Sequence, residues 1–195
     1  MRSMGSAVAL SLLGGLLLGC DDVTRPTSGD QESRTLSEGA LAAKAGSERQ
    51  VNMMDACDPE TFNAALGAGM CVRNGGVRFE DFLEQLSKHQ TVGAWHFTPP
   101  GVHVKVGQIL LAVNQGGEVH TFTEVEEFGG GIVPDLNTLS GNPTPAPECL
   151  ALEPADFVPS GGTYSDEVEE EGDELYQCCI HPWMRTTIHA RGTAR

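Results

Sequence analysis

One short segment near the end of the chain gathers several side chains that can bind a metal. Residues 176–184 read YQCCIHPWM, so Cys178, His181 and Met184 follow one another at intervals of three. A thiolate, an imidazole and a thioether on one tight loop can face a single point. Soft sulfur together with imidazole favours copper, and one thiolate with two histidines and a weak axial methionine describes a blue-copper centre.

Such a centre needs a second histidine from elsewhere in the chain. His120 lies in GGEVHTFTEV, a strand-like segment after a Gly-Gly turn, from which it could reach the loop across a sandwich of sheets. Alone, His120 would more often be an ordinary strand histidine, but the loop makes it the best second ligand. The remaining histidines lack comparable spacing, so we expect them at the surface or in local hydrogen bonds: His89, His96, His103 and His189.

The two adjacent cysteines have to be told apart. Successive strand residues point to opposite faces, and only Cys178 gives the spacing C-x-x-H, so we assign Cys178 to the metal. Cys179 is then free to pair with Cys149, while a Cys57–Cys71 disulfide would hold down the short helix between them. A redox role for the vicinal pair ranks lower, because vicinal disulfides are strained and no C-x-x-C occurs. A methionine ligand argues against zinc.

The start of the chain predicts export. Residues 1–20 read MRSMGSAVALSLLGGLLLGC, an apolar run too short to span a bilayer after a short positive start. Its end resembles the bacterial lipoprotein box, which implies cleavage before Cys20 and lipidation of Cys20, although an ordinary signal peptide is the alternative. We expect a signal peptide over 1–19, a lipidated flexible tether over 20–55 and a folded domain over 56–195. The protein would then be anchored in the periplasm or at the cell surface, where disulfides form.

The elements that must position these ligands are mainly short strands. Helical signals cover 58–67 and 79–89, and β-rich runs separated by Gly and Pro follow them. Residues 128–148 carry little periodicity and predict a long loop, before two further strands at 163–168 and 174–179 and a last one at 185–190. Several short strands without βαβ alternation predict an antiparallel sandwich.

The segment GGTYSDEVEEEGDELYQCCIHPWMRTTI resembles the C-terminal part of cupredoxins, the type 1 copper proteins related to plastocyanin, azurin and amicyanin. The resemblance implies an all-β Greek-key antiparallel β-sandwich with one copper. It implies the ligand set His120, Cys178, His181 and axial Met184. It further implies one-electron transfer through the exposed edge of His181, beside a docking patch containing Pro182 and Trp183. Thr121 departs from the asparagine that often follows the first ligand histidine.

Composition narrows the choice of partners. The formal charge of −15 disfavours nucleic acid, whose phosphates an acidic surface repels. The sequence contains no acid–base pair, phosphate loop or nucleophile triad that would indicate an enzyme, so we expect a monomeric electron carrier with redox protein partners. The alternative function is copper binding and delivery by the same ligands, without electron transfer.

Overall fold

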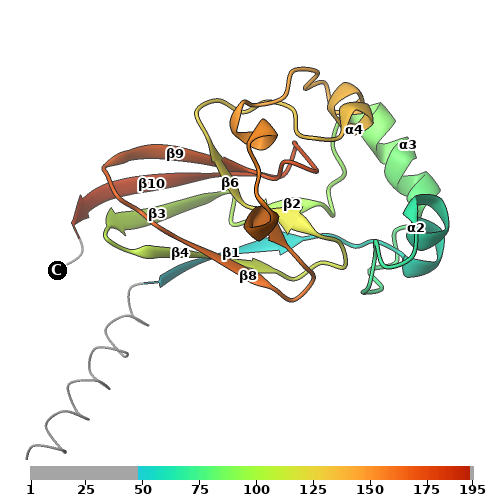
Figure 1. Cartoon of the computed structure of the whole chain (residues 1–195), viewed down its shortest axis with the longest axis horizontal. Helices are drawn as coiled ribbons and strands as arrows, with labels where there is room; N and C mark the ends of the chain where they lie inside the picture. The colour runs from blue at the N-terminus through green and yellow to red at the C-terminus, as the bar shows by residue number, and fades with distance from the viewer. Residues whose placement is uncertain (1–47, 194–195) are drawn as a thin grey trace, which may run out of the picture. The chain divides into compact units, whose positions relative to one another are not determined.

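The computed structural model describes residues 48–193, which form two four-stranded sheets and a separate two-stranded ladder (Figure 1). The first sheet has the order β2-β1-β4-β8, with bounds His96–Thr98, Glu48–Met54, Ile109–Asn114 and Thr163–Glu167. The second has the order β3-β10-β9-β6, with bounds Gly101–Val106, Arg185–Thr193, Gly172–Gln177 and Thr123–Val125. The ladder pairs β5, His120–Thr121, with β7, Phe157–Val158.

The predicted β-sandwich class is confirmed, with mixed strand directions inside the sheets. Most neighbouring strands are antiparallel, but β1 runs parallel to β4 and β10 runs parallel to β3. Alternating burial explains why these segments are strands. In β4, Leu110, Ala112 and Asn114 are buried between half-buried neighbours, and in β10 Thr186 and Ile188 alternate in the same way. The core therefore lies between the two sheets.

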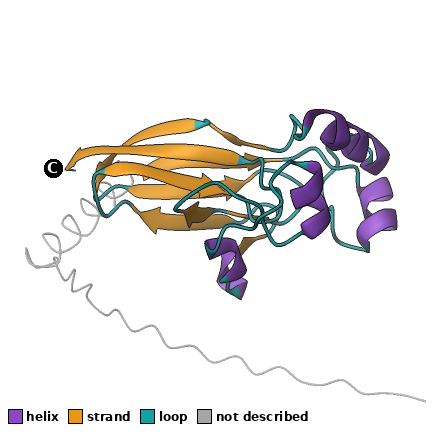
Figure 2. Ribbon diagram, turned by 90° about the horizontal axis from the view of Figure 1, so that it is seen from above, coloured by secondary structure: helices purple, strands orange, loops and turns teal. Residues whose placement is uncertain are grey.

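Helices gather at one end of the strands, as the view from above shows (Figure 2). Helix α2 covers Pro59–Leu66, and helix α3 covers Phe79–His89, both where the sequence predicts them. Asp58 begins α2 because its carboxylate accepts the backbone N–H of Thr61 at 3.0 Å, and Pro59 occupies the first turn. The two helices bring Phe62 and Phe82 into contact over the end of the sandwich, with ring centroids 5.6 Å apart.

Two sequence predictions about the elements were wrong, one on where the tether ends and one on a loop. Strand β1 occupies 48–54, inside the segment 20–55 that was assigned to the tether. Its buried Val51 and Met53 alternate with more exposed polar residues, a pattern too short to stand out from its hydrophilic surroundings. The predicted loop 128–148 contains helix α4, Pro134–Leu139, and runs into the 3-10 turn η1, Glu148–Leu150.

A second 3-10 turn, η2, covers Pro154–Asp156 and leads into β7. The predicted signal peptide, the lipidated Cys20 and the tether up to residue 47 lie outside the described residues. Within residues 48–193, no helix has the length and apolarity that crossing a bilayer requires.

Candidate metal centre

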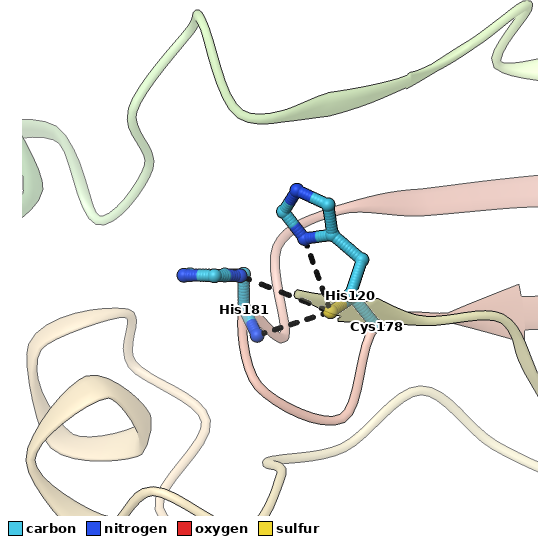
Figure 3. A group of neighbouring side chains, drawn as sticks. All are labelled: His120, Cys178 and His181. Carbon is cyan, nitrogen blue, oxygen red and sulfur yellow. Dashed lines mark hydrogen bonds between the residues drawn. The ribbon is translucent and has the colours of Figure 1, made fainter. Parts of the chain in front are cut away.

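Three of the predicted ligands meet at one buried point (Figure 3). The Nδ1 atoms of His120 and His181 each lie 3.8 Å from the sulfur of Cys178. Their potential ligand atoms all lie within 4.8 Å of one another, and all three residues are buried. No other group of three such residues is close enough to hold a metal in the part of the chain that the structure describes.

The loop between β9 and β10 brings two of these ligands together with Met184. The backbone N–H of Cys178 donates to the carbonyl of Met184 at 3.0 Å, and that of Met184 donates to the carbonyl of His181 at 2.9 Å. These two bonds close a compact turn around the segment. Met184 is fully buried in the same core cluster as Cys178. The predicted axial residue is therefore fixed next to the ligand loop by its backbone and by its burial.

The sulfur of Cys178 receives further hydrogen bonds from the backbone. The N–H groups of Thr121 and His181 both point at it, each at 3.5 Å. Burial raises the pKa of the Cys178 thiol, but hydrogen bonds and positive charge from His120 and His181 outweigh burial, so the pKa falls well below its usual value. The site therefore favours a thiolate, which is the form that binds metals.

His120 is held on its far side by a buried carboxylate. Its Nε2 lies 2.8 Å from Oδ2 of Asp55, and neither side chain is exposed. Asp55 also accepts the N–H groups of Gly117 and Glu118 at 2.9 and 3.0 Å. Burial raises the pKa of Asp55, but the bonds from His120 and these two amides lower it to about 2. The bond from Nε2 to Asp55 leaves Nδ1, which faces the sulfur, as the nitrogen that would bind a metal.

The same interactions act on the His120 imidazole. Burial lowers the pKa of His120, while the hydrogen bond to Asp55 and the neighbouring Cys178 thiolate raise it to about 9. The second imidazole has a looser acidic neighbour, because Nε2 of His181 lies 3.7 Å from Oε2 of Glu118. Glu118 itself is anchored by the indole N–H of Trp95 at 2.6 Å, and burial raises the pKa of its carboxyl group.

The adjacent cysteines enter different buried clusters, as predicted, although both lie just after β9, which ends at Gln177. Cys178 belongs to the main core cluster, whereas Cys179 belongs to a separate cluster in which it forms a disulfide with Cys149. The other predicted pair, Cys57 and Cys71, is also joined. The hydroxyl of Thr121, in β5, accepts the N–H of Cys179 at 2.8 Å and so links the two adjacent cysteines to that strand.

The segment 128–150 is packed closely against the end of the ligand loop that follows β9. The N–H of Ile132 donates to the carbonyl of Cys179 at 2.7 Å. Gly131 lies so near that an added Cβ would stand 1.8 Å from that same carbonyl oxygen. The guanidinium of Arg185 donates to Asn142 at 2.7 Å and stacks over the ring of Phe128 at 4.7 Å. Together with the Cys149–Cys179 disulfide, these contacts fix this segment to the ligand loop.

The predicted docking residues are less exposed than the resemblance implies. Pro182 is buried and Trp183 is half-buried. His181 is only 3% exposed, and aromatic rings surround it. The centroid of its ring lies 5.5 Å from Trp183, 6.4 Å from Phe82 and 6.5 Å from Trp95. Little of the His181 ring is therefore exposed, and aromatic side chains enclose much of it.

Sequence reasoning missed two residues that support the ligands. Asp55 was placed in the tether, and Trp95 was not considered for the site. A polar residue directly after the alternation of Val51 and Met53 was the available signal for Asp55, because polar groups at strand ends often face a site. Trp95 carried no such signal, since its contact with Glu118 joins residues 23 positions apart across the fold.

Comparisons with known proteins find distant likenesses among solved structures. No protein-family model matches the chain, and no curated protein sequence is significantly similar to it. A purple cupredoxin from Nitrosopumilus maritimus is 15% identical over 73% of this chain and 98% of that chain, with a TM-score of 0.42. A Cu(I) form of an amicyanin mutant is 20% identical over 49% of this chain and 73% of that chain, with a TM-score of 0.35. Likenesses at this level carry no functional argument, so the chemistry must come from the site itself.

Proposed function

We propose that the chain binds one type 1 copper ion and acts as a one-electron carrier. The observation that carries this proposal is the approach of both imidazole Nδ1 atoms to one buried cysteine sulfur at 3.8 Å. His120, Cys178 and His181 would hold the metal, with Met184 as a weak axial ligand. When bound, copper supplies the Cu(II)/Cu(I) couple.

The donor set fits copper better than zinc. Two imidazoles and one thiolate, with a thioether on the same loop, are the soft and borderline ligands that copper prefers in electron-transfer sites. Structural zinc sites use four cysteine, histidine or carboxylate ligands. Here only three such residues come together among residues 48–193. The thioether of Met184 would be an unusual fourth ligand for zinc.

Rigid support of the ligands favours electron transfer. Asp55 fixes the ring of His120, the backbone amides of Thr121 and His181 fix the sulfur, and the disulfide at Cys179 fixes the strand end. Ligands that keep one arrangement in both oxidation states lower the reorganisation that accompanies each electron. The same burial disfavours the alternative of copper delivery, since a donor protein has to expose its ligands to an acceptor.

The cellular setting is part of the proposal. The first twenty residues of the sequence support export and lipidation at Cys20. The protein would then be anchored to a membrane in the periplasm or at the cell surface. We propose that the protein is monomeric and exchanges electrons with redox proteins near the ligand loop, where Trp183 is the partly exposed member of the predicted docking pair.

Copper addition to the full chain tests the function. An intense blue or purple colour with narrow copper hyperfine splitting in the EPR spectrum is expected from a copper–thiolate bond in a type 1 site. A protein that stays colourless and binds only Cu(I) would instead support delivery.

The cysteine doublet supplies the matched variants for this test. Cys178→Ser should abolish the intense visible band, because it removes the thiolate. Cys179→Ser should keep the band, because Cys179 lies in a different buried cluster, in the disulfide with Cys149. The reverse pattern would overturn the ligand assignment.

A further inference from the structure

A pocket of about 670 Å³ opens beside the ligand loop. Its walls come from α2, α3 and α4, with Phe82, Leu139 and Ile180 among its apolar lining residues. Two buried polar side chains, Glu118 and His181, also line it. Pockets of this volume, mostly apolar with a few convergent polar groups, are characteristic of small-molecule sites.

The rim of this pocket exposes unusually large apolar side chains. Leu66, Met70 and Leu83 are 47%, 48% and 37% exposed, and all three line the pocket. They come from α2, the segment after it and α3. Exposed apolar surface that surrounds a concavity is removed from water when an apolar ligand enters.

The polar end of the pocket offers a hydrogen-bond acceptor. Oε2 of Glu118 accepts the indole N–H of Trp95 at 2.6 Å and lies 3.7 Å from Nε2 of His181. Within residues 48–193, no hydrogen bond engages the other carboxylate oxygen, Oε1. Since Nδ1 of His181 faces the sulfur of Cys178, the opposite side of the same imidazole faces Glu118 and the pocket.

From these features we infer that the pocket binds a small aromatic alcohol, with its ring among the apolar side chains and its hydroxyl donating to Glu118. The chain carries a formal charge of −15, and Asp135 also lines the pocket, so anionic ligands such as fatty acids are disfavoured. An organic cation would lose its hydration in this mostly apolar pocket, whereas a neutral hydroxyl can donate to Glu118 without that cost.

The ligand would touch the imidazole of a proposed copper ligand on the side away from the metal. Binding itself requires only the pocket and Glu118, so it can be measured on protein without copper. If 4-methylphenol does not bind, the proposal of a copper site is unaffected. If copper does not bind, the proposal of a ligand pocket is unaffected. The two proposals are therefore tested separately.

The direct experiment titrates the copper-free full chain with 4-methylphenol and follows the indole N–H resonance of Trp95 by NMR. The matched ligand is 4-methylanisole, which has a similar shape and no hydroxyl donor. We expect saturable shifts with 4-methylphenol. The affinity for the ether should be at least about tenfold lower, because the ether lacks the hydrogen bond to a charged group. Equal binding of both ligands, or tighter binding of 4-methylbenzylamine, would overturn the inference.

Variants locate the binding site. Leu83→Trp should fill the rim of the pocket and weaken 4-methylphenol binding by about tenfold or more. Leu150→Trp is the matched control, because Leu150 is 68% exposed and does not line the pocket. Glu118→Gln should keep the pocket shape and reduce the preference for the phenol over its ether. Unchanged binding in Leu83→Trp, or equal loss in Leu150→Trp, would show that the ligand binds elsewhere.

Discussion

Nε2 of His120 lies 2.8 Å from Oδ2 of Asp55, and both side chains are completely buried. This pair joins the end of β1 to β5, and it directs the opposite nitrogen of His120 toward Cys178. A buried carboxylate in this position sets both the tautomer and the orientation of the ring. The first strand of the described fold therefore takes part in forming the candidate metal centre.

Replacement of Asp55 by asparagine should weaken metal binding. The substituted amide would keep the shape of the side chain but lose the charge that holds the proton on Nε2 of His120. Loss of such a supporting carboxylate typically lowers metal affinity by about 10–100-fold. Copper affinity measured by competition with a chelator would test the change.

Asp173→Asn is the matched control for that variant. Asp173 also accepts a hydrogen bond from a histidine, at 3.0 Å from Nδ1 of His189, but it is half exposed and lies outside the centre. Its replacement should leave copper affinity unchanged. Equal losses in the two variants would contradict a specific role for Asp55.

The same pair predicts how the stability of the metal-free protein depends on pH. The raised pKa of His120, about 9, contributes stability that is fully present below its ordinary value near 6.5 and is lost as pH rises through 9. The lowered pKa of Asp55, about 2, contributes stability that is present above its ordinary value near 3.8 and is lost as pH falls through 2. The combined contribution is therefore largest between about pH 4 and 6.5.

Urea unfolding of the metal-free chain at several pH values measures this contribution. The difference in unfolding free energy between the wild type and Asp55→Asn should be largest near pH 5 and should shrink from pH 6.5 to above pH 9. A difference that stays constant over this range would show that His120 and Asp55 do not interact as a charged pair.

Most of the strands and the ligand loop could be predicted from the sequence because their signals are local. β-rich runs separated by Gly and Pro mark the strands, and the spacing of Cys178, His181 and Met184 is visible in nine residues. The Cys149–Cys179 disulfide was also predicted, because the C-x-x-H spacing assigns Cys178 to the metal and leaves Cys179 free to pair. Local periodicity and spacing therefore identified the residues that could bind metal.

What could not be predicted depends on contacts between distant segments. Asp55 reaches His120 across 65 positions, and Trp95 reaches Glu118 across 23. Neither pair has a local pattern, and the short β1 resembles its polar surroundings. The pocket was missed for the same reason, since α2, α3 and α4 line it only after the chain has folded.

The disulfide next to the ligand loop should contribute stability without supplying a ligand. Cys149 and Cys179 are 30 positions apart, and closing a loop of that size stabilises a fold by about 3–4 kcal/mol in the chain-entropy model. The double variant Cys149→Ser/Cys179→Ser should lose a similar amount in unfolding free energy and keep the visible band with copper. Loss of the band in a variant that remains folded would show that the disulfide determines the metal site itself.

Because the segment 128–150 packs closely against Cys179, replacement of Gly131 should destabilise the fold. In Gly131→Ala the new Cβ would meet the carbonyl oxygen of Cys179, which is backbone and cannot rotate away. We expect a loss of about 1–3 kcal/mol in unfolding free energy, as for other overpacked sites, and an altered EPR spectrum. Gly172→Ala is the control, because its Cβ would meet nothing within 4 Å. Equal effects of the two variants would contradict this account.

Met184 provides the sharpest test of how the centre is tuned. Met184→Leu nearly preserves side-chain volume in the core, so it should change the unfolding free energy by less than about 1.5 kcal/mol. If the thioether is a weak axial ligand, its removal takes away a donor that stabilises Cu(II), and the reduction potential should rise while the visible band persists. Protein-film voltammetry and the visible spectrum measure the two quantities. An unchanged potential in a stable, coloured variant would show that Met184 only fills the core.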